Sequence, residues 1–147
     1  FVPRVLAVEK GRNIVFPNSD NIRHHVYSFS KPKSFQIKLY KGVPKKPLSF
    51  DNDGIVVLGC NIHDSMIGYV FVSPWPVFSV TPDNGLVEFE TRPKEVAVWH
   101  PWVSGLKAPI KVAVTENESN TLQVELKITA PKAPKTIKSK FKKYYNK

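Results

Sequence analysis

The two sulfur atoms of this sequence lie close together, with a histidine between them. Cys60 is the single cysteine of the 147 residues, Met66 is the single methionine, and His63 lies midway between them. Thiolate, imidazole and thioether groups are ligands for soft and borderline transition metals. A loop this short can bring all three to one point, so the spacing predicts a metal site with Cys60, His63 and Met66 as ligands.

A fourth ligand has to come from elsewhere, and His24 and His25 stand at the head of a strand-like segment. Two histidines and a cysteine in one plane, with a weak axial methionine, form the ligand set of electron-transfer copper sites. Zinc is the main chemical rival, because it also binds one cysteine and two histidines. Met66 favours copper, since zinc gains little from a thioether. A reactive thiol or a buried structural cysteine are the remaining interpretations of Cys60.

The elements around these residues read as short strands. Thirteen prolines and many β-branched and aromatic residues favour strands joined by turns. The run 54–59 is apolar on both faces, as a central buried strand would be. In the run 34–42, Phe35, Ile37 and Leu39 fall on one face. We therefore expect an all-β sandwich over residues 1–74, with strands within 4–11, 13–18, 24–30, 34–42, 54–59 and 66–73.

A second unit is expected after Pro74 and Pro76, over residues 75–130. Asp83, Asn84 and Gly85 supply the turn of a hairpin. His100, which has tryptophans on both sides, is interpreted as part of a strand end that packs on its neighbour. The pattern predicts a small second β-sandwich with strands at 77–80, 86–91, 95–100, 110–115 and 121–128.

The net charge of +10 is concentrated at the end of the chain. Residues 131–147 contain seven lysines and no acidic residue, so the first 130 residues carry about +3. This Lys-rich tail is either solvated or lies on an anionic membrane surface or a neighbouring protein chain. Nucleic acid is excluded as a partner, because the charge is not on a folded face with stacking residues. A lone cysteine excludes an internal disulfide, and no apolar run is long enough to cross a membrane.

Two stretches resemble blue copper proteins, the cupredoxins, of the plastocyanin and amicyanin type. The segment "FVPRVLAVEKGRNIVFPNSDNIRHHV" is similar to plastocyanin without a gap, with Phe-Val-Pro at its start and a histidine six residues after Asn18. Gly54 also falls where plastocyanin has a glycine. The spacing of Cys60, His63 and Met66 resembles the short ligand loop of amicyanin. The resemblance covers residues 1–72 and implies a Greek-key sandwich.

Carried over residue by residue, the resemblance makes His24, Cys60 and His63 the equatorial ligands and Met66 the axial ligand. It implies one copper ion per chain, alternating between Cu(II) and Cu(I). His25 replaces the asparagine that usually follows the first ligand, so the identity of that ligand has two candidates. Strand alternation would turn His25, Tyr27 and Phe29 inward together, whereas the spacing from Asn18 favours His24.

The resemblance also implies a function, a location and partners. We expect a one-electron carrier that is exported to the periplasm or another extracytoplasmic site, with redox proteins such as c-type cytochromes as partners. The sequence contains four histidines, too few for the second copper centre of an oxidase or a nitrite reductase, so we expect no enzyme activity. Copper delivery is an alternative function.

The segments "FSVTPDNGLVEFE" and "VAVWHP", residues 78–90 and 96–101, resemble the transthyretin-like sandwich of carboxypeptidase regulatory domains. At the other end of the chain, the first strand of plastocyanin has no counterpart. A neighbouring chain could cover the edge that this strand would occupy. A structural cupredoxin subunit of a larger assembly is therefore a further alternative.

Overall fold

The computed structural model describes residues 1–63, 65–103, 108–114 and 121–130, which form strands, turns and extended segments but no helix. This part of the chain consequently has no helix long and apolar enough to span a membrane. The predictions about residues 131–147 lie outside the described residues. The strands are β1 (Val5–Glu9), β2 (Arg12–Ile14), β3 (His24–Ser30), β4 (Lys33–Tyr40), β5 (Leu48–Phe50), β6 (Gly54–Cys60), β7 (Gly68–Ser73), β8 (Glu95–Val98) and β9 (Ile110–Ala113).

The all-β prediction is confirmed for the described residues, and the first half of the chain forms a sandwich of two sheets. Five strands form one sheet in the order β1-β7-β6-β3-β4, and β2 pairs with β5 in a second, smaller sheet. Only β1 and β7 run parallel; the other pairs of the large sheet are antiparallel. As expected from its apolar sequence, β6 is a central strand. The short strand β5 was not predicted.

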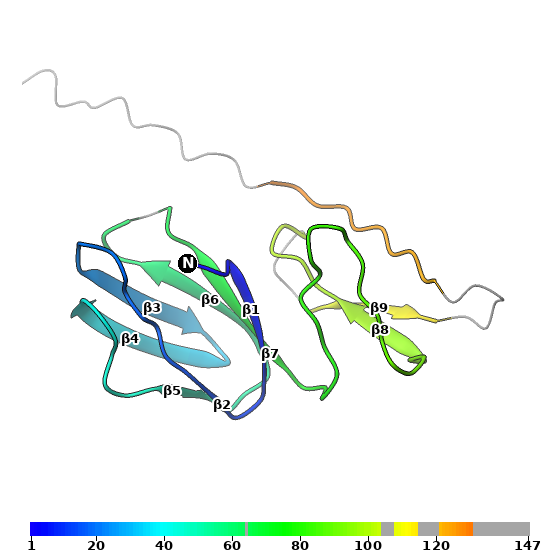
Figure 1. The fold of residues 1–147 in the computed structure, drawn as a ribbon, viewed down its shortest axis with the longest axis horizontal. Helices are drawn as coiled ribbons and strands as arrows, with labels where there is room; N and C mark the ends of the chain where they lie inside the picture. The colour runs from blue at the N-terminus through cyan, green and yellow to red at the C-terminus, as the bar shows by residue number, and fades with distance from the viewer. Residues whose placement is uncertain (64, 104–107, 115–120, 131–147) are drawn as a thin grey trace, which may run out of the picture.

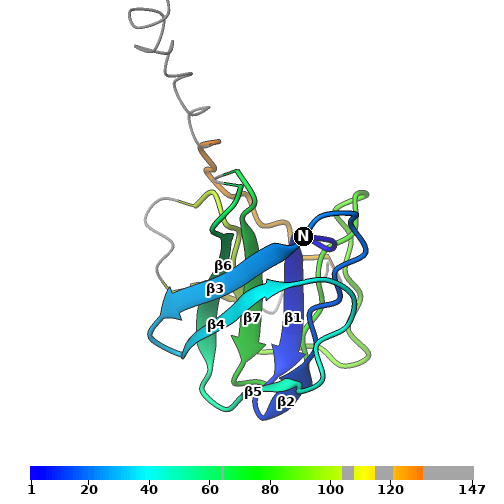
Figure 2. The ribbon, with the colours of Figure 1, turned by 90° about the vertical axis from the view of Figure 1, so that its left-hand side faces the viewer.

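The large sheet bends at the end of β6 that carries Cys60. Along most of its length β6 pairs with β7, from Gly54 to Leu58. Its pairing with β3 is confined to Gly59 and Cys60, which lie opposite Tyr27 and Val26. The β3–β4 hairpin therefore crosses in front of β1, β7 and β6 and forms the second layer of the sandwich (Figure 2). Cys60 lies at the corner where the two layers meet.

Strands β2 and β5 lie together at one end of the sandwich (Figure 1), and residues of both strands belong to the hydrophobic core. Phe35 and Phe16 lie at its border, with their ring centroids 5.5 Å apart. Full burial of an aliphatic or aromatic side chain contributes about 1.5–3 kcal/mol relative to exposure, so this cluster is the main source of stability. Its buried members are Ile14, Phe50, Val56, Leu58, Val70 and Val72.

A β-bulge interrupts the hairpin beside His24. One residue lies between the pairing positions His24 and Val26 on β3, whereas two residues lie between their partners Tyr40 and Ile37 on β4. The extra residue on β4 breaks the alternation of its side chains. Leu39 is therefore 54% exposed, and the prediction that it shares one face with Phe35 and Ile37, which are half-buried, is wrong.

The second half of the chain has less regular structure than predicted. Strands β8 and β9 pair where strands were expected. The turn also exists: Gly85 has a φ of 76° and its N–H donates to the carbonyl of Pro82. However, 77–80 and 86–91 form no strand, and 121–128 contributes one bridge, from Ile128 to Val103. The prediction of strands in these three segments is wrong.

A lack of burial explains why these segments form no sheet. No described residue after Pro74 is buried, so alternating apolar residues there have no second layer to pack against. The main aromatic contact with the sandwich is Trp99, whose ring lies 5.6 Å from that of Tyr69 and 6.0 Å from that of Phe71. Because both partners lie on the outer face of β7, this part of the chain covers that face, as the sequence suggested for the segment around His100.

Candidate metal centre

His24 is held at the start of β3 by contacts on both ring nitrogens. Its Nε2 lies 2.6 Å from Oδ2 of Asp20, and its Nδ1 lies 3.5 Å from Sγ of Cys60. The ring is buried, because the strand pairing of His24 with Tyr40 turns it into the sandwich. The carboxylate of Asp20 orients the ring so that Nδ1 faces the thiol.

Cys60 ends β6 and is also buried, with 3% of its surface exposed. Burial by itself raises the pKa of the thiol. The hydrogen bond with His24 and backbone N–H groups of Ile62, His25 and His63 act in the opposite direction, and the net effect lowers the pKa of Cys60. The polypeptide thus stabilises the thiolate, which is the form of cysteine that binds metals.

His63 completes a group of three nitrogen and sulfur ligands. It follows Cys60 in the loop between β6 and β7, and its ring centroid lies 5.4 Å from that of His24. The ligand atoms of His24, Cys60 and His63 all lie within 4.8 Å of one another. Unlike the other two residues, His63 is exposed. A hydrogen bond from the N–H of Met66 to the carbonyl of His63, 2.9 Å long, shapes the loop.

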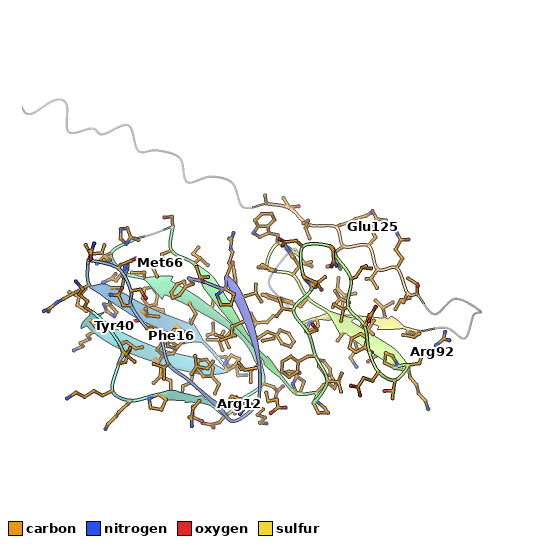
Figure 3. The ribbon with its side chains drawn as sticks, viewed as in Figure 1. Arg12, Phe16, Tyr40, Met66, Arg92 and Glu125 are labelled. Carbon is orange, nitrogen blue, oxygen red and sulfur yellow. The ribbon has the colours of Figure 1, made fainter. Side chains whose placement is uncertain are left out.

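Met66 is half-buried and follows His63 in the loop between β6 and β7. Both residues line a shallow cavity of about 340 Å³ over the outer face of β3 and β6, together with Tyr27 and Phe29. Figure 3 shows Met66 and Tyr40 at the same end of the sandwich. Met66 is therefore linked to two residues of the group of three, through the cavity that it shares with Cys60 and the backbone hydrogen bond to His63.

His25 lies on the other face of β3 from His24. Its ring packs edge-on against Tyr27 at 6.1 Å, and its Nε2 is buried without a hydrogen-bond partner among the described residues. The residues of β3 that turn inward are His24, Val26 and Ser28. The alternative in which His25, Tyr27 and Phe29 point inward is thus wrong, and the structure brings His24, the favoured candidate, to Cys60.

The donor set fits copper. Two imidazoles and a thiolate at one point satisfy the preferences of both Cu(I) and Cu(II), and the carboxylate behind His24 fixes its ring. Asp20 was not predicted from the sequence to contact a residue of the site. Its position four residues before His24 is the only signal that could have indicated it.

His100 lies away from this group. Its Nδ1 accepts a hydrogen bond of 3.1 Å from the backbone N–H of Trp102, and the two rings are 5.5 Å apart. These contacts belong to the turn that follows β8. They agree with a packing role for His100.

The solved structures similar to this chain include cupredoxins. A purple cupredoxin from Nitrosopumilus maritimus is 22% identical, with 49% of this chain and 80% of that chain covered and a TM-score of 0.44. A pseudoazurin from Sinorhizobium meliloti is 20% identical, over 49% of this chain and 59% of that chain, with a TM-score of 0.37. A copper-containing nitrite reductase from Thermus scotoductus is 24% identical, over 51% of this chain and 20% of that chain, with a TM-score of 0.45.

No protein-family model and no curated protein matches the sequence. The plastocyanin and amicyanin type, the transthyretin-like second unit and the domain boundaries therefore stay predictions.

Proposed function

We propose that this chain is a type 1 copper protein that carries single electrons between redox proteins outside the cytoplasm. The observation that supports the proposal is the convergence of His24, Cys60 and His63 within 4.8 Å. These three residues would hold the metal, with Met66 as a weak fourth ligand. Copper bound to imidazole and thiolate groups can alternate between Cu(I) and Cu(II).

The protein contributes a rigid frame for this site. His24 and Cys60 each belong to a strand, and the carboxylate of Asp20 fixes the His24 ring from behind. A frame of this kind limits the movement of the ligands when the charge of the site changes. The exposed ring of His63 gives an electron-transfer partner its closest approach to the site.

The same geometry disfavours the alternatives. A copper-delivery protein has to pass its metal on, which buried ligands such as His24 and Cys60 hinder. An oxidase or nitrite reductase needs a second metal centre, and the two remaining histidines, His25 and His100, pack against Tyr27 and Trp102. We therefore propose that the chain by itself is not an enzyme.

The visible absorption spectrum of the copper-loaded, oxidised protein tests this function. We expect an intense thiolate-to-copper charge-transfer band that disappears on reduction and is absent from Cys60→Ser. His100→Ala is the matched control, because His100 lies outside the site, and it should keep the band. A colourless protein that still binds one metal ion tightly would overturn the electron-carrier proposal.

A further inference from the structure

The charges within residues 1–130 are unevenly distributed. Residues 1–74 contain ten basic and five acidic residues, a net charge of +5, whereas residues 75–130 contain five basic and seven acidic residues, a net charge of −2. The sandwich formed by residues 1–74 is therefore more basic than the net charge of +3 for residues 1–130 indicates. Within it, residues 21–50 contain no acidic residue and seven basic ones, namely Arg23, Lys31, Lys33, Lys38, Lys41, Lys45 and Lys46.

The β-bulge brings part of this charge to the metal end of the sandwich. It lies between the pairs His24–Tyr40 and Val26–Ile37, and it leaves two consecutive residues of β4, Lys38 and Leu39, exposed. A regular strand would have turned one of the two inward. The edge of the sheet beside His24 thus presents a lysine and a leucine together.

Backbone contacts fasten two loops beside the bulge. Asn18 and Gly42 form a β-bridge, and Nδ2 of Asn18 donates to the carbonyls of Ile22 and Tyr40 at 2.9 and 2.8 Å. Nζ of Lys41 also lies 3.4 Å from the carbonyl oxygen of Asn21. Segments 18–24 and 38–43 consequently lie side by side.

Together they form a surface that we call the basic patch. Its three apolar side chains are exposed, at 49% for Ile22, 54% for Leu39 and 69% for Val43. An apolar centre with a charged rim is typical of a surface that docks another protein transiently. The basic patch consists of Ile22, Leu39 and Val43 with Arg23, Lys38 and Lys41.

The basic patch lies next to the proposed electron port. Arg23 precedes His24 in the chain, Lys41 follows Tyr40, and the His24 ring lies 5.4 Å from that of the exposed His63. Asp20 is the one acidic residue of segments 18–24 and 38–43; its side chain is 66% exposed and its Oδ2 lies 2.6 Å from Nε2 of His24. With Arg23, Lys38 and Lys41, the two segments still carry a net charge of +2. A partner that docks here would therefore meet positive charge and approach His63.

We infer that the basic patch is the docking surface for an electron-transfer protein with an acidic surface around its own redox centre. This inference rests on the proposed function. A protein is favoured over an anionic membrane because the patch flanks the exposed ligand, where a lipid headgroup would cover His63 without exchanging electrons. Complementary charge would raise the association rate at low ionic strength, and salt would screen it over about 8–10 Å.

Stopped-flow kinetics with two c-type cytochromes, one acidic and one basic, tests the inference on the copper-loaded full chain. The variants are Lys38→Glu and Lys41→Glu, singly and together. Lys31→Glu is the matched control, because Lys31 is exposed and lies on the same hairpin, but at the other end of the seven-residue strand β3, roughly 20 Å away. The Lys-rich tail is kept in every protein.

We expect each single patch variant to slow electron exchange with the acidic cytochrome by about threefold or more at low ionic strength, and the double variant to slow it by about tenfold. Exchange with the basic cytochrome should become faster, and high salt should remove both effects. An equal loss in Lys31→Glu would show that net charge alone matters and would overturn the inference. Unchanged rates in all variants would also overturn it.

Two further readouts separate the possible failures. If the wild-type protein lacks the charge-transfer band, the proposed function has failed and the docking inference fails with it. If the band is present in every variant and the rates do not respond to the patch, only the docking inference fails. Binding to phosphatidylserine-containing vesicles that Lys38→Glu abolishes, with cytochrome rates unchanged, would assign the basic patch to a membrane and overturn the inference.

Discussion

The Nδ1 atom of His24 lies 3.5 Å from the Sγ atom of Cys60, although 36 positions separate the two residues in the sequence. Both side chains are buried, so their main polar neighbours are each other, the carboxylate of Asp20 and backbone N–H groups. The hydrogen bond with Cys60 raises the pKa of His24, burial opposes it, and the bond with Asp20 adds to the increase. A metal ion bound to both atoms would displace the proton that they share, so metal binding should release protons.

The first prediction concerns the ionisation of Cys60 in the metal-free protein. Because the pKa of this thiol is lowered, the thiolate should form at a lower pH than in an unfolded chain. His24→Ala removes the hydrogen bond and leaves burial, which raises the pKa, so the titration should move to higher pH. The ultraviolet absorbance of the thiolate measures this directly. His63→Ala is the control, since only the backbone N–H of His63 acts on the thiol; an equal shift there would contradict the assignment to His24.

The second prediction concerns the carboxylate behind His24. Asp20→Asn weakens the contact at Nε2 without removing a metal ligand, so the ring loses part of its orientation. We expect the copper affinity to fall by about 10- to 100-fold, as measured by competition with a chelator of known affinity. Asp53→Asn, which breaks an exposed ion pair with Lys10, should leave the affinity unchanged. Equal affinities for all three proteins would show that Asp20 does not support the site.

The sequence was sufficient to predict the parts of this molecule in which local patterns and burial agree. The apolar run 54–59 predicted a central strand, and the observed strand β6 (Gly54–Cys60) is one residue longer. The close spacing of Cys60, His63 and Met66 predicted a cluster near one loop. The sequence spacing from Asn18 favoured His24 over His25 as the first ligand. In the structure, Asn18 is a buried residue whose side chain holds the adjacent loops together.

The predictions for Leu39 and for residues 86–91 are wrong because the structure at these positions depends on how the segment pairs and packs with the rest of the chain. Alternation along β4 predicted Leu39 on the same face as Phe35 and Ile37, but the bulge opposite His25 turns it to the other face. The apolar alternation of 86–91 predicted a strand, yet Leu86 is 66% exposed because no second layer covers it. Neither the position of a bulge nor the absence of a packing partner is encoded in the local pattern.

The third prediction tests whether Leu39 is exposed, by comparing it with the buried Leu58. Leu58 is 4% exposed within the core, so Leu58→Ala should lower the free energy of unfolding by about 2–5 kcal/mol. Leu39→Ala removes the same atoms from a side chain that is 54% exposed, and should change the free energy by less than about 0.5 kcal/mol. Denaturant unfolding of the metal-free proteins measures both. A large loss for Leu39→Ala would mean that Leu39 packs in the core.

The fourth prediction concerns Met66, which lines the same cavity as Cys60. If Met66 is a weak axial ligand, Met66→Leu should keep the thiolate-to-copper band, because the three stronger ligands remain, and should shift the reduction potential. Potentiometric titration of the copper-loaded protein measures the shift. Ile67→Leu, on the neighbouring exposed residue, is the control and should leave the potential unchanged. Identical potentials for Met66→Leu and wild type would remove Met66 from the ligand set.

The last prediction concerns Gly54, which begins β6. Its φ of 128° is a conformation that residues with a side chain rarely adopt, and an added Cβ would lie 2.8 Å from Cγ of Pro32. Gly54→Ala therefore combines backbone strain with a steric clash, and we expect a loss of about 2–4 kcal/mol in the free energy of unfolding.

The double variant with Pro32→Ala separates the two causes. Pro32→Ala opens the space beside Gly54 but leaves the backbone angle, so the cost of Gly54→Ala should fall without vanishing in that background. A cost that does not change would show that the backbone angle alone requires glycine. A cost that disappears would show that the chain can relax at this position, and that Gly54 is needed only because Pro32 from the β3–β4 turn packs against the start of the strand that ends at Cys60.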